Sequence, residues 1–136
     1  MEVTVRHLNQ VQFEIQSRSH TIVCDQPADN GGNDTGMTPP ELLLASLGSC
    51  AAFYAAQYLH ARKLDEHSVT VSVTAEKLRQ PARLGNFKIN VRCALDLTPE
   101  QREGMMRSVH LCLIHNTLIN PPSISIDLAL EQPAQI

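Results

Sequence analysis

Residues 38–50 read Thr-Pro-Pro-Glu-Leu-Leu-Leu-Ala-Ser-Leu-Gly-Ser-Cys, and a stretch rich in Ala and Leu continues to about Lys63. Thr38 followed three residues later by Glu41 matches a capping box, and Pro39 suits the first helical position. After Glu41 the stretch is almost free of charge, so the helix is apolar on most of its sides. We therefore predict a buried, central helix over residues 38–63.

A second capped helix is predicted later in the chain. Thr-Pro-Glu-Gln at 98–101 repeats the capping box with Pro in the first helical position. This helix should run to about Leu118, because the following Asn120-Pro121-Pro122 cannot continue it. The first helix carries Cys50 and the second carries Cys112. If the two helices pack together, their thiols can meet.

The N-terminal part of the chain is predicted to be β-structure followed by a long loop. Short runs within residues 1–24 alternate apolar and polar side chains, which indicates a three-stranded meander. Residues 25–37 are dense in Gly, Asn and Asp and must form a loop. Loops of this length inside a compact domain are often functional.

The remaining strands complete an α+β pattern. Strands at 68–78 and 87–97, joined by a loop at 80–86, predict a hairpin between the two helices. A last strand is expected at 123–130. The order βββ-α-ββ-α-β predicts a single α+β domain, residues 1–136, with mainly antiparallel sheets.

The composition is that of an ordinary soluble protein. Of the 136 residues, 43% are hydrophobic and 18% are charged, which suits a folded domain with its own core. The net charge of −3 argues against a nucleic-acid-binding surface. We expect no segment that spans a bilayer and no signal peptide, so the expected location is the cytoplasm, without membrane association.

The four cysteines, at positions 24, 50, 93 and 112, should be reduced in that compartment. None is spaced as C-x-x-C, and we predict neither a metal site nor a cofactor. His110 and His115 flank Cys112, but on one helix His110 faces away from the other two. His115 either tunes the Cys112 thiol or is a hydrogen-bonded or exposed histidine. Cys24 and Cys93 are interpreted as small core side chains.

The apolar character of residues 42–59 also predicts an assembly. A few short strands in one chain provide little cover for a helix that is apolar on nearly every side. We therefore expect a homodimer that buries the long helices together.

The chain resembles one known family through Gly31-Gly32 … Gly36-Met37-Thr38-Pro39-Pro40-Glu41-Leu42-Leu43-Leu44-Ala45 … Cys50, with Cys112 in the second helix. This is the OsmC/Ohr family, named for osmotically inducible protein C and organic hydroperoxide resistance protein. The resemblance implies an intertwined homodimer with two antiparallel sheets around central helices. It also implies a thiol-dependent peroxidase that acts on organic hydroperoxides and is reduced by a dithiol. By position, Cys50 is the peroxidatic cysteine and Cys112 the resolving one.

The resemblance also implies a glutamate that holds an activating arginine, and here Glu41 is the candidate. In this family the glutamate stands ten residues before the peroxidatic cysteine, whereas Glu41 stands nine before Cys50 and Pro40 takes the tenth position. On an unbroken helix Glu41 falls nearly opposite Cys50. No arginine occurs between Arg18 and Arg62.

Activation of the Cys50 thiol requires a lowered pKa, because a free cysteine has a pKa of about 8.5. Arg6, Arg18 or an arginine of a partner chain are candidate cations. A helix N-terminus is another candidate, and Gly48 could create one by breaking the long helix just before Cys50.

Three side chains, Leu47, Phe53 and Tyr54, share the helical face of Cys50. They are predicted either to line an apolar substrate pocket or simply to pack in the core. The leading functional prediction is a two-cysteine organic hydroperoxide reductase. The alternatives are a protein of the same fold that binds a small apolar ligand, and a redox sensor that uses the thiol pair without turnover.

Overall fold

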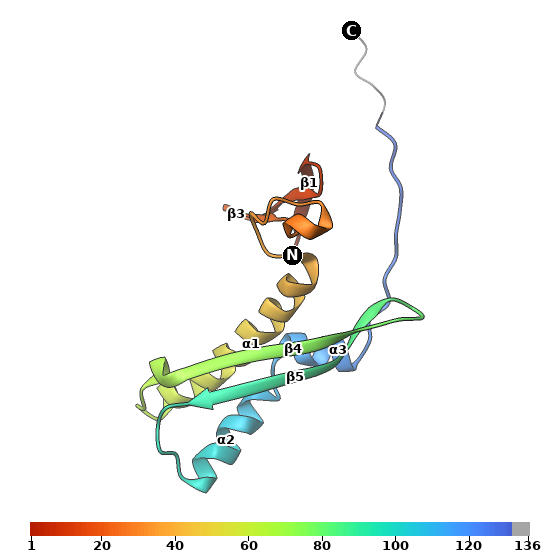
Figure 1. The fold of residues 1–136 in the computed structure, drawn as a ribbon. Coiled ribbons are helices and arrows are strands. Elements are labelled where there is room, and N and C mark those ends of the chain that lie inside the picture. Colours follow the sequence, from red (N-terminus) through yellow and green to blue (C-terminus); the bar gives the residue numbers. More distant parts are fainter. Residues whose placement is uncertain (132–136) are drawn as a thin grey trace.

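The computed structural model describes residues 1–131 and has an α+β architecture with antiparallel sheets (Figure 1). In chain order the elements are β1 (Thr4–Asn9), β2 (Gln12–Ser17), β3 (His20–Cys24), the 3₁₀ turn η1 (Ala28–Asn30), α1 (Pro39–Ala61), the 3₁₀ turn η2 (Glu66–Ser68), β4 (Val69–Leu78), β5 (Arg83–Cys93), α2 (Pro99–Val109) and α3 (Leu113–Ile119). The predicted fold class is confirmed.

The strands form two separate antiparallel sheets. The β1–β2–β3 meander has the predicted order, and β4 pairs with β5 as the predicted hairpin. The hairpin turn is tighter than predicted, because residues 79–82 alone reverse the chain and β5 already begins at Arg83. β5 also ends at Cys93, four residues before the predicted end at Leu97.

The helix α1 begins as its capping box predicts. The Glu41 N–H donates to the Thr38 hydroxyl oxygen (3.4 Å), and the Thr38 N–H donates to the Glu41 carboxylate (2.8 Å). The helix then continues through Gly48 to Ala61. The break considered at Gly48 does not occur. Eleven helical residues, 39–49, precede Cys50, so this cysteine lies well inside the helix rather than at a new N-terminus.

One face of α1 forms the core together with α2 and the β4–β5 hairpin. The buried cluster consists of Ala51, Ala55, Tyr58, Leu59, Leu97, Met105 and Val109. The helices α1 and α2 approach closely at Gly104, where an added Cβ would overlap the Tyr58 ring. The rest of α1 is less covered, since Leu43 and Phe53 are exposed. Within one chain, α1 is thus buried along only part of its surface.

The predicted second helix is two helices. α2 ends at Val109, and α3 begins at Leu113 with Cys112 as its N-cap. The backbone of Cys112 (φ −53°, ψ 122°) is not helical, and its sulfur accepts a hydrogen bond from the His115 N–H at 3.4 Å. A cysteine sulfur here takes the capping role that Ser or Thr oxygens usually take. The prediction of one continuous helix was therefore wrong at this point.

The predicted last strand does not form within one chain. Residues 121–131 have no strand partner among the described residues and extend away from the rest of the chain (Figure 1). A strand exists only by hydrogen bonding to a neighbour. The alternating side chains Ile124, Ile126, Leu128 and Leu130 are each more than 80% exposed.

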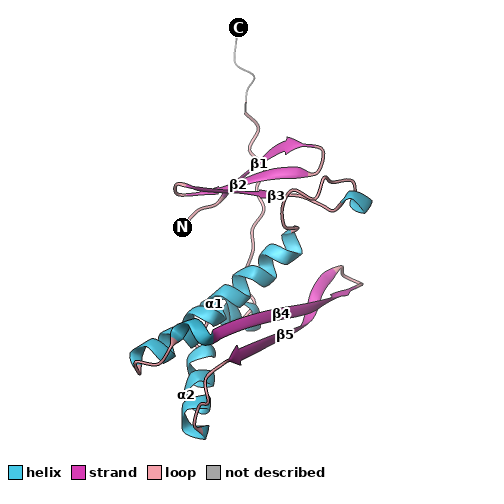
Figure 2. Ribbon diagram, turned by 60° about the vertical axis from the view of Figure 1, so that its left-hand side comes forward, coloured by secondary structure: helices cyan, strands magenta, loops and turns pink. Residues whose placement is uncertain are grey.

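The β1–β3 sheet lies beyond the N-terminal end of α1, away from the β4–β5 hairpin (Figure 2). Every residue of β1 is exposed. The whole chain exposes 10820 Å². A folded monomer of 15.0 kDa exposes about 7000 Å². One chain therefore leaves far more surface uncovered than a self-sufficient monomer does.

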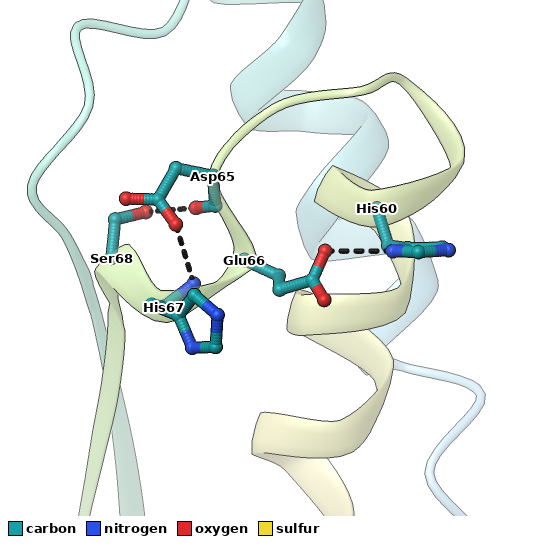
Figure 3. Close-up of polar contacts among 5 residues, drawn as sticks. All are labelled: His60, Asp65, Glu66, His67 and Ser68. Atoms are coloured by element: carbon teal, nitrogen blue, oxygen red, sulfur yellow. Dashed lines mark hydrogen bonds and ion pairs between the residues drawn. The ribbon is translucent and has the colours of Figure 1, made fainter.

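A short polar turn connects α1 to β4 (Figure 3). The Asp65 carboxylate accepts the His67 N–H (3.0 Å), and the Ser68 hydroxyl donates to the Asp65 carbonyl (2.7 Å). Glu66 reaches back to the His60 ring near the end of α1, with 2.7 Å between Oε2 and Nδ1. These contacts stabilise the turn at residues 62–68, after which β4 runs alongside α1.

The helix α1 is long and apolar enough to cross a membrane, judged by length and composition alone. This contradicts the prediction that no segment reaches that limit. The core helix of a soluble protein passes the same test. Here α1 packs against β4, α2 and α3, so its apolar character serves packing within the fold.

The loop at residues 25–37 is organised by a carboxylate that the sequence did not single out. Asp25 is 1% exposed and accepts the Thr35 hydroxyl at 2.7 Å. It also accepts the backbone N–H groups of Gln26, Asn33 and Thr35. The Thr35 hydroxyl is the main cause of a lowered pKa, from 3.8 to about 2; burial opposes the shift and the backbone N–H groups add to it. This network sets the path of the chain into α1.

Asp25 predicts a specific acid sensitivity. Because its folded pKa lies below the ordinary value, its ionised form stabilises the fold above pH 4, and this contribution disappears as the pH falls towards 2. Urea unfolding between pH 2 and 7 should therefore show a stability loss on acidification that is smaller in Asp25→Asn. Exposed Asp29→Asn is the control and should behave as the wild type. Identical pH dependence in Asp25→Asn and the wild type would contradict this role.

Candidate functional site

The helices α1 and α3 bring Cys50 and Cys112 together. The Cys112 thiol is within hydrogen-bonding reach of the Cys50 sulfur. Cys112 is completely buried, whereas Cys50 is partly exposed. The other two cysteines lie elsewhere: Cys24 is buried at the end of β3, and Cys93 contacts the Ser68 hydroxyl at 3.4 Å.

The start of α3 supplies the groups that activate Cys50. Burial opposes ionisation of this thiol, but hydrogen bonds from the Cys112 thiol and from the Ile114 and Leu113 N–H groups outweigh it and lower the pKa of Cys50. Free N–H groups at a helix N-terminus stabilise negative charge. The sequence correctly named a helix N-terminus as a candidate activator. It assigned that terminus to a break in α1, whereas it belongs to α3.

Cys112 has the opposite character. Burial is the main cause of its raised pKa, and donation of its proton to Cys50 raises the pKa further. The His115 N–H, which donates to the Cys112 sulfur, only partly offsets this effect. Cys50 is therefore the more acidic thiol of the pair, and Cys112 is the less acidic one.

An apolar cavity of about 520 Å³ lies between α1, α3 and β5, lined by Leu43, Leu47, Leu84, Phe87, Ile89, His115, Leu118 and Ile119. Leu47 precedes Cys50 by one helical turn, and His115 follows Cys112 by the same spacing. The α1 and α3 walls of the cavity therefore each include a residue one helical turn from a cysteine of the pair. The cavity has the size and apolar lining of a small-molecule site.

Of the three side chains predicted to line a pocket beside Cys50, only Leu47 does so in the described structure. Phe53 is 57% exposed and lies in a shallow depression with His60 and Glu66. Tyr54 packs edge-on against Phe53, with ring centroids 5.2 Å apart. The three side chains share a helical face with Cys50, but of the three only Leu47 is among the residues that line the cavity.

Glu41 is placed away from the thiols. It precedes Cys50 by nine residues, about 14 Å along the helix axis. Its carboxylate accepts the Thr38 N–H and hydroxyl, which, with Lys77 nearby, hold its pKa below the usual range. It lines a separate, larger cavity of about 700 Å³ between the 25–37 loop and β4. In this structure Glu41 caps a helix.

No arginine of the described residues lines the apolar cavity. Arg6 pairs with Glu14 across β1 and β2 at 2.9 Å, and Arg18 lies in the β2–β3 turn. Within the described chain, the groups that lower the pKa of Cys50 are the Cys112 thiol and the N–H groups of Leu113 and Ile114. Sequence reasoning missed them because backbone N–H groups carry no residue signature, and no Gly or Pro marks the break at residues 110–112.

Residues 31–127 match the OsmC-like protein family. The chain belongs to this family. The match includes α1, the β4–β5 hairpin, both later helices and most of the C-terminal segment, and hence both cysteines of the site. No curated protein shows significant similarity to the chain.

Solved structures share the OsmC-like fold. A Psychrobacter arcticus protein, described as an osmotic stress induced and detoxification response protein, superposes with a TM-score of 0.76 at 20% identity over 85% of each chain. An OsmC like protein from Mycoplasma pneumoniae gives 0.75 at 18% identity, covering 88% of this chain and 87% of the other. An organic hydroperoxide resistance protein OsmC from Legionella pneumophila gives 0.59 at 16%, covering 87% and 89%. At these identities the likeness shows the fold.

The geometry of the pair predicts selective reactivity of Cys50. Iodoacetamide at pH 7 should modify Cys50 before Cys24, Cys93 or Cys112, because its lowered pKa gives more thiolate. Cys112→Ala removes the S–H donor, so the midpoint pH of Cys50 labelling should rise and labelling at pH 7 should slow. Peptide mapping by mass spectrometry measures both. The control Cys93→Ala should leave Cys50 labelling unchanged; equal labelling of Cys50 in all three proteins would contradict the role of Cys112.

Proposed function

We propose that this OsmC-like protein is a thiol-dependent peroxidase that reduces organic hydroperoxides. The observation that carries the proposal is a pair of interacting thiols with opposite pKa shifts, with an apolar cavity lined by Leu47 and His115, each three residues from one of them. Family membership and the hydroperoxide resistance named for the Legionella pneumophila protein support it. An apolar cavity favours an alkyl or aryl group on the peroxide, and Leu47 is the side chain of α1 that would contact this group one turn before Cys50.

The reaction uses the two sulfurs in turn. The Cys50 thiolate attacks the terminal oxygen of ROOH, the O–O bond breaks, and an alcohol and a Cys50 sulfenic acid result. Cys112 then attacks the sulfenic sulfur, forming the 50–112 disulfide and releasing water. An external dithiol reduces the disulfide by thiol exchange and restores both thiols. This cycle starts from reduced cysteines, the state that the cytoplasm maintains.

The same cavity supports a second candidate function. Seven of its eight lining residues are apolar, so it would also hold a small apolar ligand without any chemistry at Cys50. Such a protein, or a sensor that oxidises once and does not turn over, would share every geometric feature described above. Repeated consumption of peroxide distinguishes a peroxidase from a ligand-binding protein or a sensor.

The peroxidase is tested by consumption of cumene hydroperoxide with dihydrolipoamide as reductant. The wild type should turn over. Cys50→Ser should lose activity roughly a thousandfold or more, since the nucleophile is gone. Cys112→Ser should still react once but fail to form the disulfide, so its turnover with the dithiol should fall strongly.

Cys93→Ala is the matched control for these variants, because Cys93 is a partly exposed cysteine in contact with Ser68. It should keep the wild-type rate. A wild type that consumes no peroxide would end the peroxidase proposal and leave the ligand-binding one. A single oxidation to the 50–112 disulfide without turnover would instead favour the sensor.

We further propose that the working form is a homodimer. The excess exposed surface, the uncovered β1–β3 sheet and the unpaired apolar segment 123–130 all lack cover within one chain. A second copy supplies that cover if this segment adds as a strand to a sheet of the partner. Backbone hydrogen bonds to the partner sheet and burial of one apolar face of segment 123–130 would stabilise the dimer.

Light scattering at micromolar concentration should therefore show a dimer. Alternate residues of a strand face opposite sides. Ile124→Asp with Ile126→Asp should thus weaken the dimer at least tenfold. Ser123→Asp with Ser125→Asp, which changes the other face by the same charge, should weaken it much less. A monomeric wild type at these concentrations would overturn the dimer proposal.

A further inference from the structure

His115 is the polar residue among those that line the apolar cavity, and one of its ring nitrogens is unsatisfied. Its ring nitrogen Nδ1 is buried and has no hydrogen-bond partner among the described residues. The same side chain lines the cavity of about 520 Å³. A buried polar atom without a partner is costly and requires an explanation. Nδ1 itself has almost no accessible surface, so a ligand in the cavity would meet the imidazole through its other ring nitrogen, Nε2.

The position of His115 ties this nitrogen to the thiol pair. It follows Leu113 and Ile114, whose N–H groups donate to the Cys50 sulfur, and its own N–H donates to Cys112. The first turn of α3 thus directs three consecutive backbone groups at the two sulfurs and places an imidazole in the cavity beside them.

Among the described residues that line the cavity, His115 alone can give up a proton. α1 contributes Leu43 and Leu47, and the hairpin contributes Leu84, Phe87 and Ile89. The titratable groups near His115 are Cys112 and His110, whose ring centroid lies 5.7 Å away. His110 does not line this cavity. Within the part of the chain that the structure describes, a leaving group formed inside the cavity would therefore meet one titratable wall residue, the imidazole of His115.

Peroxide reduction creates such a leaving group. When the Cys50 thiolate attacks ROOH, the O–O bond breaks and the oxygen bonded to carbon departs as an alkoxide. An alkoxide is a strong base, and an apolar cavity stabilises its charge poorly. A proton donated as the bond breaks removes this cost, and histidine is the side chain best suited to donate one near neutral pH.

We propose that His115 is a catalytic residue that protonates the departing alkoxide. The inference rests on the proposed peroxidase function. The thiolate sulfur forms a bond to the terminal OH and is oxidised to a sulfenic acid, while the peroxide is reduced. The His115 imidazolium transfers its proton to RO⁻, giving ROH and neutral imidazole, which solvent protonates again. Cys50 supplies the electrons and His115 supplies the proton.

The test compares two peroxides with the same aromatic ring and different leaving groups. Cumene hydroperoxide must release an alkoxide, whereas peroxybenzoic acid releases benzoate, a weak base that needs no protonation. Stopped-flow measurement of Cys50 oxidation in the full chain gives a rate constant for each. In His115→Gln the cumene hydroperoxide rate should fall about a hundredfold, the usual value of general acid catalysis, while the peroxybenzoic acid rate falls less than fivefold.

A merely structural role would lower both rates together, so the ratio of the two rate constants decides the question. A ratio that falls at least tenfold supports the proposal, and a smaller change overturns it. His115→Asn provides a second variant if His115→Gln does not fold. His110→Gln is the control, because this histidine is adjacent and outside the cavity; its ratio should equal that of the wild type. A wild type that reacts with neither peroxide would instead overturn the proposed function itself.

Discussion

The site depends on hydrogen bonds that the first turn of α3 donates to the sulfurs of Cys50 and Cys112. They exist because the chain leaves the helical conformation at Cys112 and restarts at Leu113, which exposes N–H groups that a continuous helix would use internally. The Cys112 sulfur caps the new helix through the His115 N–H and donates its own proton to Cys50. The same residue therefore caps a helix and lowers the pKa of its partner thiol.

The helix α1 provides the rigid support for this arrangement. Its buried alanines allow α2 to pack closely, and the intact helix through Gly48 holds Cys50 at a defined depth beneath α3. The N-terminal end of α1 is attached to the Asp25-centred loop, and that loop carries the β1–β3 sheet. Much of this sheet and of the C-terminal segment has no cover in one chain. The β1–β3 sheet is joined to the N-terminal end of α1, which carries Cys50, and the C-terminal segment follows α3. Association with a second copy would therefore act on the two helices that support the thiols.

Glu41 belongs to the family motif, but in this chain its carboxylate caps α1 instead of contacting the thiol pair. Glu41 retains the helix opening that identifies the family, but its carboxylate is engaged by Thr38, roughly two and a half turns from Cys50. No arginine of the described residues lines the cavity. Backbone N–H groups, a neighbouring thiol and an imidazole occupy the places where charge could be stabilised. A hydrogen-bonded thiolate needs no formal positive charge if enough donors converge on it.

Local signals in the sequence determined the meander, the central hairpin, both capped helix starts and the family, because caps, alternation and turn residues act over a few neighbouring positions. The two cysteines could be chosen from four for the same reason: the family motif is local to each of them. Tertiary structure alone decided the break at residues 110–112, the assignment of Phe53 and Tyr54 away from the cavity, and the role of Asp25. It also decided that 123–130 remains unpaired within one chain. These features depend on which atoms meet across segments far apart in the sequence, and neither a hydrophobic period nor a capping motif contains that information.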